Sequence, residues 1–327
     1  MNVYITLDYE LFLSSKTGTV DNCLIKPTAE LLKTLDLAGV KATFFVDAAY
    51  LIRLSRVPEL KTDYAKVSEH IKRLSMSGHS IQLHFHPQWL YSTYRDGKWQ
   101  MDMEHYKLSD MSYGDVERNL AEACRLLQSL SGRQVTTFRA GGYSIMDFER
   151  YKDLFGKIGI RKDTSVLRGK VCASRFQQYD YHEVPALSSY PFSKDIVKVD
   201  PTGSFIEYPI ATKKAIALIS TIKTYLTLKR ARGTAKKWGD GKSVGTENKN
   251  SSWIKSHWHL LVGSVFETAS IDSLGNSLKD VYKYSCSHYQ GNDFVIIGHP
   301  KNITPFSLNN LTAFINEVGA DSFRVME

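Results

Sequence analysis

The sequence lacks the features of a secreted or membrane-spanning chain. Its first eight residues contain no basic stretch followed by an apolar one, so we expect no signal peptide. No stretch is long and apolar enough to span a bilayer. The cysteines lie far apart and form no CxxC pair, which favours reduced thiols over disulfides or a zinc finger: Cys23, Cys124, Cys172 and Cys286. We therefore expect a cytoplasmic protein.

Acidic residues are scarce in one part of the chain. The net charge of the 327 residues is +8. Eleven basic and only two acidic residues fall between Lys213 and Lys255, which gives this segment a net charge of +9. The remainder of the chain therefore sums to −1, and any argument about an acidic partner is confined to this segment.

Strand and helix patterns alternate along the chain. Short apolar runs typical of buried strands occur at 3–7, 42–46, 81–85, 136–138, 158–160, 205–208, 262–266, 294–297 and 323–325. Between the early runs, apolar residues recur at helical spacing, and a glycine follows each helical segment. This alternation predicts a parallel sheet or a βα barrel. In such folds the functional groups lie at the carboxyl ends of the strands.

Polar residues stand where these strands are expected to end: Asp8, Glu10, His84, His86, Arg139, Asp163 and His299. Each has a structural alternative when taken alone, because a carboxylate after a strand often caps a helix and an arginine often forms an ion pair. Residues two apart on an extended chain point the same way, so Asp8 shares a face with Glu10, and His84 with His86. Two imidazoles, a carboxylate and an open fourth position form the ligand set of a catalytic zinc site.

These motifs together resemble the polysaccharide deacetylases with the NodB-homology domain. Five segments carry the resemblance in the family's order: Asp8-Tyr9-Glu10, 78–84, 138–144, 163–166 and 298–300. The resemblance covers about residues 1–166 and 290–326. Its specificity comes from the order and spacing of the motifs together. It implies an α/β fold, a distorted (β/α) barrel of the polysaccharide-deacetylase type, in a single domain over 1–327 with a basic insertion at about 211–256.

The resemblance also implies roles for individual residues. Glu10, His84 and His86 would bind a divalent metal, with zinc as the first expectation. Asp8 would be the general base, Arg139 would orient Asp8, and His299 would be the general acid that protonates the departing amine. Backbone N–H groups near Gly142 and Tyr143 would help to hold the oxyanion.

The motifs depart from the family pattern at the metal ligands. A tyrosine separates Asp8 from Glu10, where the family has adjacent aspartates, and the metal position holds a glutamate. His84 and His86 are two residues apart, where the family's histidines are four apart. His79 is therefore an alternative ligand. We disfavour it, because residues 79 and 84 would face opposite sides of one strand.

Three residues are assigned to the saccharide: Trp89, Gly142 and Asp163. Trp89 follows the metal motif, where a stacking surface would serve a sugar, and core packing is its alternative.

The basic segment allows two interpretations. Its apolar residues between 213 and 232 cluster at helical spacing, which fits a helix that packs on the barrel and has a solvated basic end. The other interpretation is a surface helix in 213–255 that makes peripheral contact with anionic lipid and brings the site to a lipid-linked sugar. We expect no nucleic acid, because no recognised motif is present and the rest of the chain is not basic.

We therefore predict a metal-dependent hydrolase of carbohydrate metabolism. It would remove an N-acyl group, in the first instance acetyl, from an amino sugar during surface polysaccharide biosynthesis. Two alternatives stay open: a deacylase or amidase acting on a small C–N substrate, and an inactive saccharide-binding protein. Asp8, Arg139 and His299 argue against the inactive protein, since a binding module needs no acid–base pair.

Overall fold

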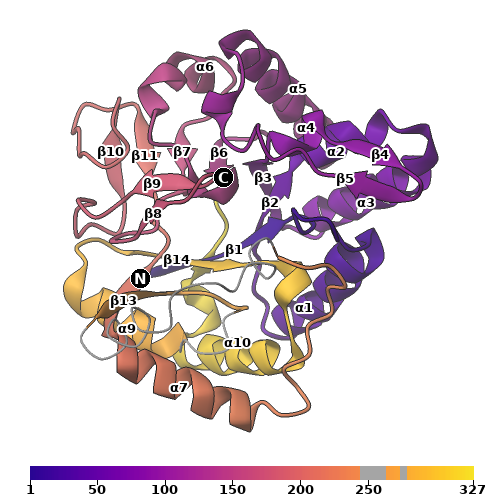
Figure 1. Ribbon diagram of the computed structural model, residues 1–327. Coiled ribbons are helices and arrows are strands. Elements are labelled where there is room, and N and C mark those ends of the chain that lie inside the picture. The colour runs from indigo at the N-terminus through magenta and orange to yellow at the C-terminus, as the bar shows by residue number, and fades with distance from the viewer. Residues whose placement is uncertain (244–262, 273–277) are drawn as a thin grey trace.

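The computed structural model describes residues 1–243, 263–272 and 278–327, and its centre is a curled, mostly parallel sheet (Figure 1). The strand order is β10 (Tyr190–Phe192), β11 (Phe205–Glu207), β7 (Lys162–Asp163), β6 (Thr137–Ala140), β3 (Ser80–Phe85), β2 (Thr43–Asp47), β1 (Asn2–Tyr9) and β14 (Asp293–Gly298). A further strand, β15 (Phe323–Arg324), also pairs with β1. Strands from both ends of the described chain therefore belong to one sheet.

Single bridges, rather than full strands, close the sheet into a barrel. Ile210 lies beyond β11 and bridges in parallel to both Leu167 and Val295. Its N–H donates to the carbonyl of Val166 at 2.9 Å, and the N–H of Ala211 donates to the carbonyl of Val295 at 3.0 Å. This closure gives the distorted (β/α) barrel that the resemblance implied, so the predicted fold class is confirmed.

Helices surround the sheet: α1 (Lys26–Leu37), α2 (Ala48–Ser55), α3 (Lys61–Met76), α4 (Gln88–Tyr91), α5 (Tyr113–Ser131), α6 (Lys152–Lys157), α7 (Ala217–Arg230), α9 (Leu278–His288) and α10 (Pro305–Val318). Short hairpins are β4–β5 (Thr93–Arg95, Lys98–Gln100) and β8–β9 (Val171–Ala173, Gln178–Asp180). The strands β12 (Thr212–Ile216) and β13 (Ser264–Thr268) pair antiparallel although α7 lies between them in the sequence. The ends of α5 follow local rules. Ser112 caps it by accepting from the N–H of Asp115, and Gly132 ends it in the left-handed region. No helix within the described ranges is long and apolar enough to cross a membrane.

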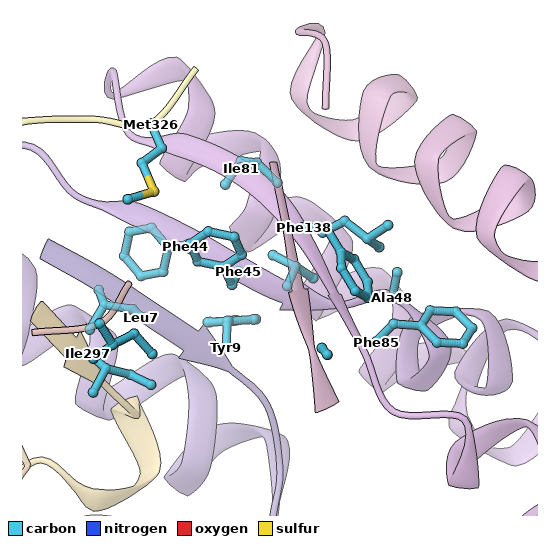
Figure 2. Packing of buried hydrophobic residues seen from close by; sticks show 14 of the residues in the cluster. Leu7, Tyr9, Phe44, Phe45, Ala48, Ile81, Phe85, Phe138, Ile297 and Met326 are labelled. Carbon is cyan, nitrogen blue, oxygen red and sulfur yellow. The ribbon is translucent and has the colours of Figure 1, made fainter. Parts of the chain in front are cut away.

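Alternation along β1 separates the core from the site. Leu7 and Tyr9 join the apolar cluster drawn in Figure 2, where the Tyr9 ring meets Phe44 of β2 edge-on at 6.2 Å. The Tyr9 hydroxyl bonds to Nδ1 of His70 in α3 at 2.7 Å, which marks this face of β1 as the helix-covered one. Because successive side chains point to opposite faces of a strand, Asp8 points into the barrel.

One predicted strand is displaced. The run 158–160 was expected to form a strand, but Ile158 caps the end of α6 and Gly159 takes a left-handed φ of 89°. The Ile160 N–H then bonds back to the carbonyl of Phe155, so the chain is still turning there. The strand β7 begins only at Lys162. Asp163 consequently lies inside a strand rather than after one.

Candidate active site

The carboxyl ends of neighbouring strands bring the predicted polar residues together. Asp8 and Glu10 come from the end of β1, and His84 and His86 from the end of β3. Arg139 belongs to β6, and His299 follows β14. Of these six side chains, only that of His299 is more than 7% exposed, at 19%. The sheet therefore assembles a cluster of charged groups that water reaches mainly from the His299 side.

Glu10, His84 and His86 form a compact set of ligand-type atoms. One such atom from each residue lies within 4.8 Å of the others. Oε2 of Glu10 is 3.4 Å from Nε2 of His84 and 3.2 Å from Nδ1 of His86. This Oε2 is buried and accepts no hydrogen bond from the described residues. An orphaned carboxylate oxygen between two imidazoles fits a divalent cation.

Electrostatics favour ionised forms in this cluster. Burial alone would lower the pKa of His84, but the carboxylates of Asp8 and Glu10 raise it to about 9. Burial would raise the pKa of Glu10, but Lys301 and the two histidines hold it well below its usual value. Nδ1 of His84 donates to the carbonyl of Arg139 at 2.8 Å, which turns Nε2 toward Glu10. A cation bound here would displace the Nε2 proton, because a metal ligand must be deprotonated.

Asp47 orients His86 and was missed in the sequence. It ends β2, and its Oδ2 lies 3.0 Å from Nδ1 of His86. Its Oδ1 accepts from the backbone N–H of His86 at 3.3 Å. Asp47 thus holds the His86 ring through the same nitrogen that faces Oε2 of Glu10. Asp47 stands at the carboxyl end of a predicted strand, so the rule that found Asp8 would also have found it.

Arg139 holds Asp8 in place. Its Nη1 donates to Oδ1 of Asp8 at 2.6 Å, its Nη2 to Oγ1 of Thr6 at 2.8 Å, and its Nε to the carbonyl of Thr164 at 3.0 Å. The guanidinium also lies 4.2 Å from the ring centre of Phe45. A fully buried arginine needs this many partners, because an unpaired charge in the core is costly.

This pair should matter for stability. We expect Arg139→Met to lower the free energy of unfolding by about 3–5 kcal/mol, because it leaves the Asp8 carboxylate buried without its cation. Chemical denaturation of the purified protein measures the loss. Arg56→Met is the matched control, since Arg56 and Glu122 pair at 2.8 Å on the surface and should contribute about 0–1 kcal/mol. Equal losses in both variants would contradict a special role for the buried pair.

His299 is held by a second carboxylate that the sequence did not reveal. Its Nδ1 lies 2.7 Å from Oδ2 of Asp272, and its Nε2 lies 3.6 Å from Oδ2 of Asp8. Burial lowers the pKa of His299, but Asp272, together with Asp8 and Glu10, outweighs burial and raises it. Asp272 stands six residues past the expected strand 262–266, so no pattern singled it out.

Lys301 is a further charged residue of the cluster. Its Nζ donates to Oε1 of Glu10 at 2.8 Å and to the carbonyl of Leu11 at 2.7 Å, and the side chain is buried. Lys301 therefore neutralises the oxygen of Glu10 that faces away from His84 and His86.

The turn after β6 brings backbone close to this cluster. A Cβ on Gly141 would lie 2.5 Å from the His86 ring, and one on Gly142 would lie 2.6 Å from the Tyr106 ring, so both positions need glycine. Tyr143 takes a left-handed φ of 61°, uncommon for a non-glycine residue. The Tyr181 hydroxyl donates to the Tyr143 carbonyl and holds this conformation. The turn thus carries a constrained backbone of the kind found at functional sites.

The structure corrects one substrate assignment and disfavours one ligand. Trp89 is 0% exposed and packs against Tyr50 and Trp99, so in this conformation it is a core residue and not a stacking surface. Asp163 is 2% exposed, as Asp8 is, and accepts from Ser165, and its assignment to the saccharide stays a prediction. His79 accepts from the N–H of Ala42 at the far end of β3, roughly 16 Å of strand from His84. Its pKa is lowered by burial to about 4.

Comparison with known proteins gives one family match and several similar structures. Residues 16–150 match the family described as polysaccharide deacetylase. Among curated proteins, none matches the sequence significantly. A candidate polysaccharide deacetylase from Mycobacterium smegmatis shares 16% identity over 98% of this chain and 85% of its own, with a TM-score of 0.50. That likeness shows the fold alone.

Two other solved structures also align along most of the chain. Puue allantoinase shares 14% identity over 97% of this chain and 83% of its own, with a TM-score of 0.48. The polysaccharide deacetylase Bc1974 from Bacillus cereus shares 14% identity over 99% of this chain and 89% of its own, with a TM-score of 0.38.

Proposed function

We propose that this chain is a hydrolase of linear amide C–N bonds that removes an N-acyl group, in the first instance acetyl, from an amino sugar. The match of residues 16–150 to the polysaccharide deacetylase family supports this proposal. The observation that carries the proposal is the pairing of Asp8 with His299. Oδ2 of Asp8 lies 3.6 Å from Nε2 of His299, and both groups border the Glu10, His84 and His86 cluster. A base and an acid beside a cation-type cluster are the groups that amide hydrolysis requires.

Each residue has a proposed part in the reaction. Asp8, fixed by Arg139, accepts a proton from the attacking water. His299, fixed by Asp272, gives a proton to the nitrogen of the departing amine. The backbone N–H groups of Gly142 and Tyr143 donate to the developing oxyanion, which the constrained turn supports.

We propose that Glu10, His84 and His86 hold a divalent cation, with zinc as the first expectation. The orphaned Oε2 of Glu10 and the orientation of His84 support this assignment. When bound, such a cation would polarise the acyl carbonyl and lower the pKa of water. We also propose that 1–327 forms one domain with a basic insertion at about 211–256, of which residues 244–256 lie outside the described part.

The ligand assignment predicts a difference between three histidines. We expect His84→Ala and His86→Ala each to lose most of the bound metal, and His79→Ala to retain it, because His79 bonds to Ala42 at the other end of β3. Elemental analysis of dialysed protein measures the metal per chain. Asp8→Asn serves as a control that alters the site but keeps the ligands. Full occupancy in His86→Ala would refute the assignment.

Acetate release from a panel of N-acetylated sugars tests the proposed substrate class. The panel should hold free, nucleotide-linked and lipid-linked amino sugars, because surface polysaccharide precursors take these forms. Release from none of them, by metal-loaded protein, would refute the amino-sugar proposal.

A further inference from the structure

The helix α7 turns a face of small residues toward the protein and exposes its large apolar residues. Ala217 is buried, and Ser220, Thr224 and Thr227 are half-buried at positions that share one helical face. The Thr224 hydroxyl donates to the carbonyl of Ser220 at 2.9 Å, and α7 contacts the antiparallel strands β12 and β13. Figure 1 shows α7 at the outer edge of the molecule.

The opposite face is apolar and open. The apolar face of α7 comprises five side chains, each 39–60% exposed: Leu218, Ile219, Ile222, Tyr225 and Leu226. A helix that packs on a barrel would bury this stripe and expose its hydroxyls. The packing-helix interpretation of the sequence is therefore wrong for the described residues of the segment. A contiguous exposed apolar patch of this kind marks an interaction surface.

Positive charge borders this face. The helix carries Lys223, Lys229 and Arg230 and no acidic residue. Lys223 pairs with Asp280 of α9 at 3.2 Å, while Lys229 and Arg230 are exposed at the carboxyl end of the helix. More bases flank α7: Lys213 and Lys214 before it, and Arg232, Lys236 and Lys237 after it. Because the rest of the chain sums to −1, the excess positive charge belongs to the segment of the sequence that contains α7.

We propose that the apolar face of α7 docks on an anionic lipid bilayer. Its five side chains enter the interfacial region, and Lys229 and Arg230 lie against the headgroups. An apolar stripe with bases along its border is the chemistry that binds such a surface. A second copy of this chain fits less well, because pairing two α7 faces would bring two positively charged segments together.

Vesicle sedimentation of the full-length protein tests the proposal. We expect binding to phosphatidylcholine vesicles that contain phosphatidylserine, weaker binding at high salt, and little binding to phosphatidylcholine alone. Ile222→Ser with Leu226→Ser should lower the partition on the order of ten-fold or more, since burial of each apolar side chain contributes to binding. Lys229→Glu with Arg230→Glu should lower it by a similar factor and remove the salt dependence.

Matched controls test whether a loss of vesicle binding reflects lost docking, an unfolded variant or a changed net charge. Lys61→Glu with Lys72→Glu changes the charge equally on the exposed face of α3 and should bind vesicles like the parent protein. Circular dichroism during thermal unfolding checks that each variant is folded. Equal binding to neutral and anionic vesicles, or no binding at all, would overturn the proposal. Self-association that the Ile222→Ser and Leu226→Ser pair abolishes, without vesicle binding, would instead identify a second copy as the occupant.

This surface does not depend on the proposed chemistry. Asp8→Asn should sediment with vesicles like the parent protein, and the α7 variants should release acetate from a soluble sugar at the parent rate. Failure of the bilayer proposal therefore leaves the proposed function standing. Failure of the acetate assay likewise leaves the vesicle result unaffected.

Discussion

Asp8→Asn is expected to lower turnover on the order of a hundred-fold or more, the usual contribution of a positioned base. The carboxamide keeps the size of the side chain but cannot accept the proton of the attacking water. Its metal content should stay that of the parent, because Asp8 is not among the clustered ligand atoms of Glu10, His84 and His86. Acetate release under saturating substrate measures turnover, and elemental analysis measures the metal.

The loss of turnover in Asp8→Asn could come from the lost base or from a displaced Arg139, and a control variant separates these two causes. Thr6→Val removes the hydroxyl that Nη2 of Arg139 binds at 2.8 Å and leaves the Asp8 carboxylate intact. We expect this variant to lose far less turnover than Asp8→Asn, because Arg139 keeps its bonds to Asp8 and to the carbonyl of Thr164. If Asp8→Asn loses no more than Thr6→Val, the base is another group.

The central residues of the site could be predicted because the order of the parallel strands brings them together. Parallel neighbours present their carboxyl ends at one edge, so Asp8, His84 and Arg139 needed only correct strand positions to be brought together. Asp47 obeys the same rule and was available from the sequence. Asp272 and Lys301 were not, because both follow irregular chain whose path depends on tertiary contacts.

Two of the residues assigned to the substrate, Trp89 and Asp163, lie in other local structures than expected. Asp163 was expected to follow a strand. Because the chain turns through Gly159, β7 begins only at Lys162, and Asp163 belongs to the strand itself. Trp89 lies in a helix of four residues whose orientation depends on the β4–β5 hairpin, which brings Trp99 against it at 5.2 Å. Neither the late start of β7 nor the contact of Trp99 with Trp89 can be seen in the periodicity of the sequence.

The sequence could not show which face of α7 is exposed, for a different reason. Its period shows an apolar face opposite a hydroxyl face, but a period does not say which face meets the protein. Ala217 is buried, which shows that the face with the small residues is the one that meets the protein. The apolar residues then face outward. Their exposure, together with the positive charge of the segment, is what supports the proposed contact with a lipid bilayer.

His299→Ala is the second change with a large expected effect, on the order of a hundred-fold in amide turnover with metal retained. A departing amine needs a proton, and the removed imidazole is the proposed donor. An activated ester with a phenol-type leaving group needs none, so its hydrolysis should fall far less. A histidine that only supports the fold would damage both reactions alike, and equal losses on amide and ester would therefore refute the general-acid role.

The pH dependence of the same residue gives an independent measurement. His299 must be protonated to act, and Asp272 raises its pKa, so the active form persists to higher pH than an ordinary histidine allows. The alkaline limb of kcat/KM should accordingly lie above the range of a free imidazole. Asp272→Asn removes the carboxylate that favours the imidazolium, so the limb should move to lower pH. His182, exposed and bonded to Asp180, is the matched control, and Asp180→Asn should leave the limb unchanged. An alkaline limb that stays in place in Asp272→Asn would assign it to a group other than His299.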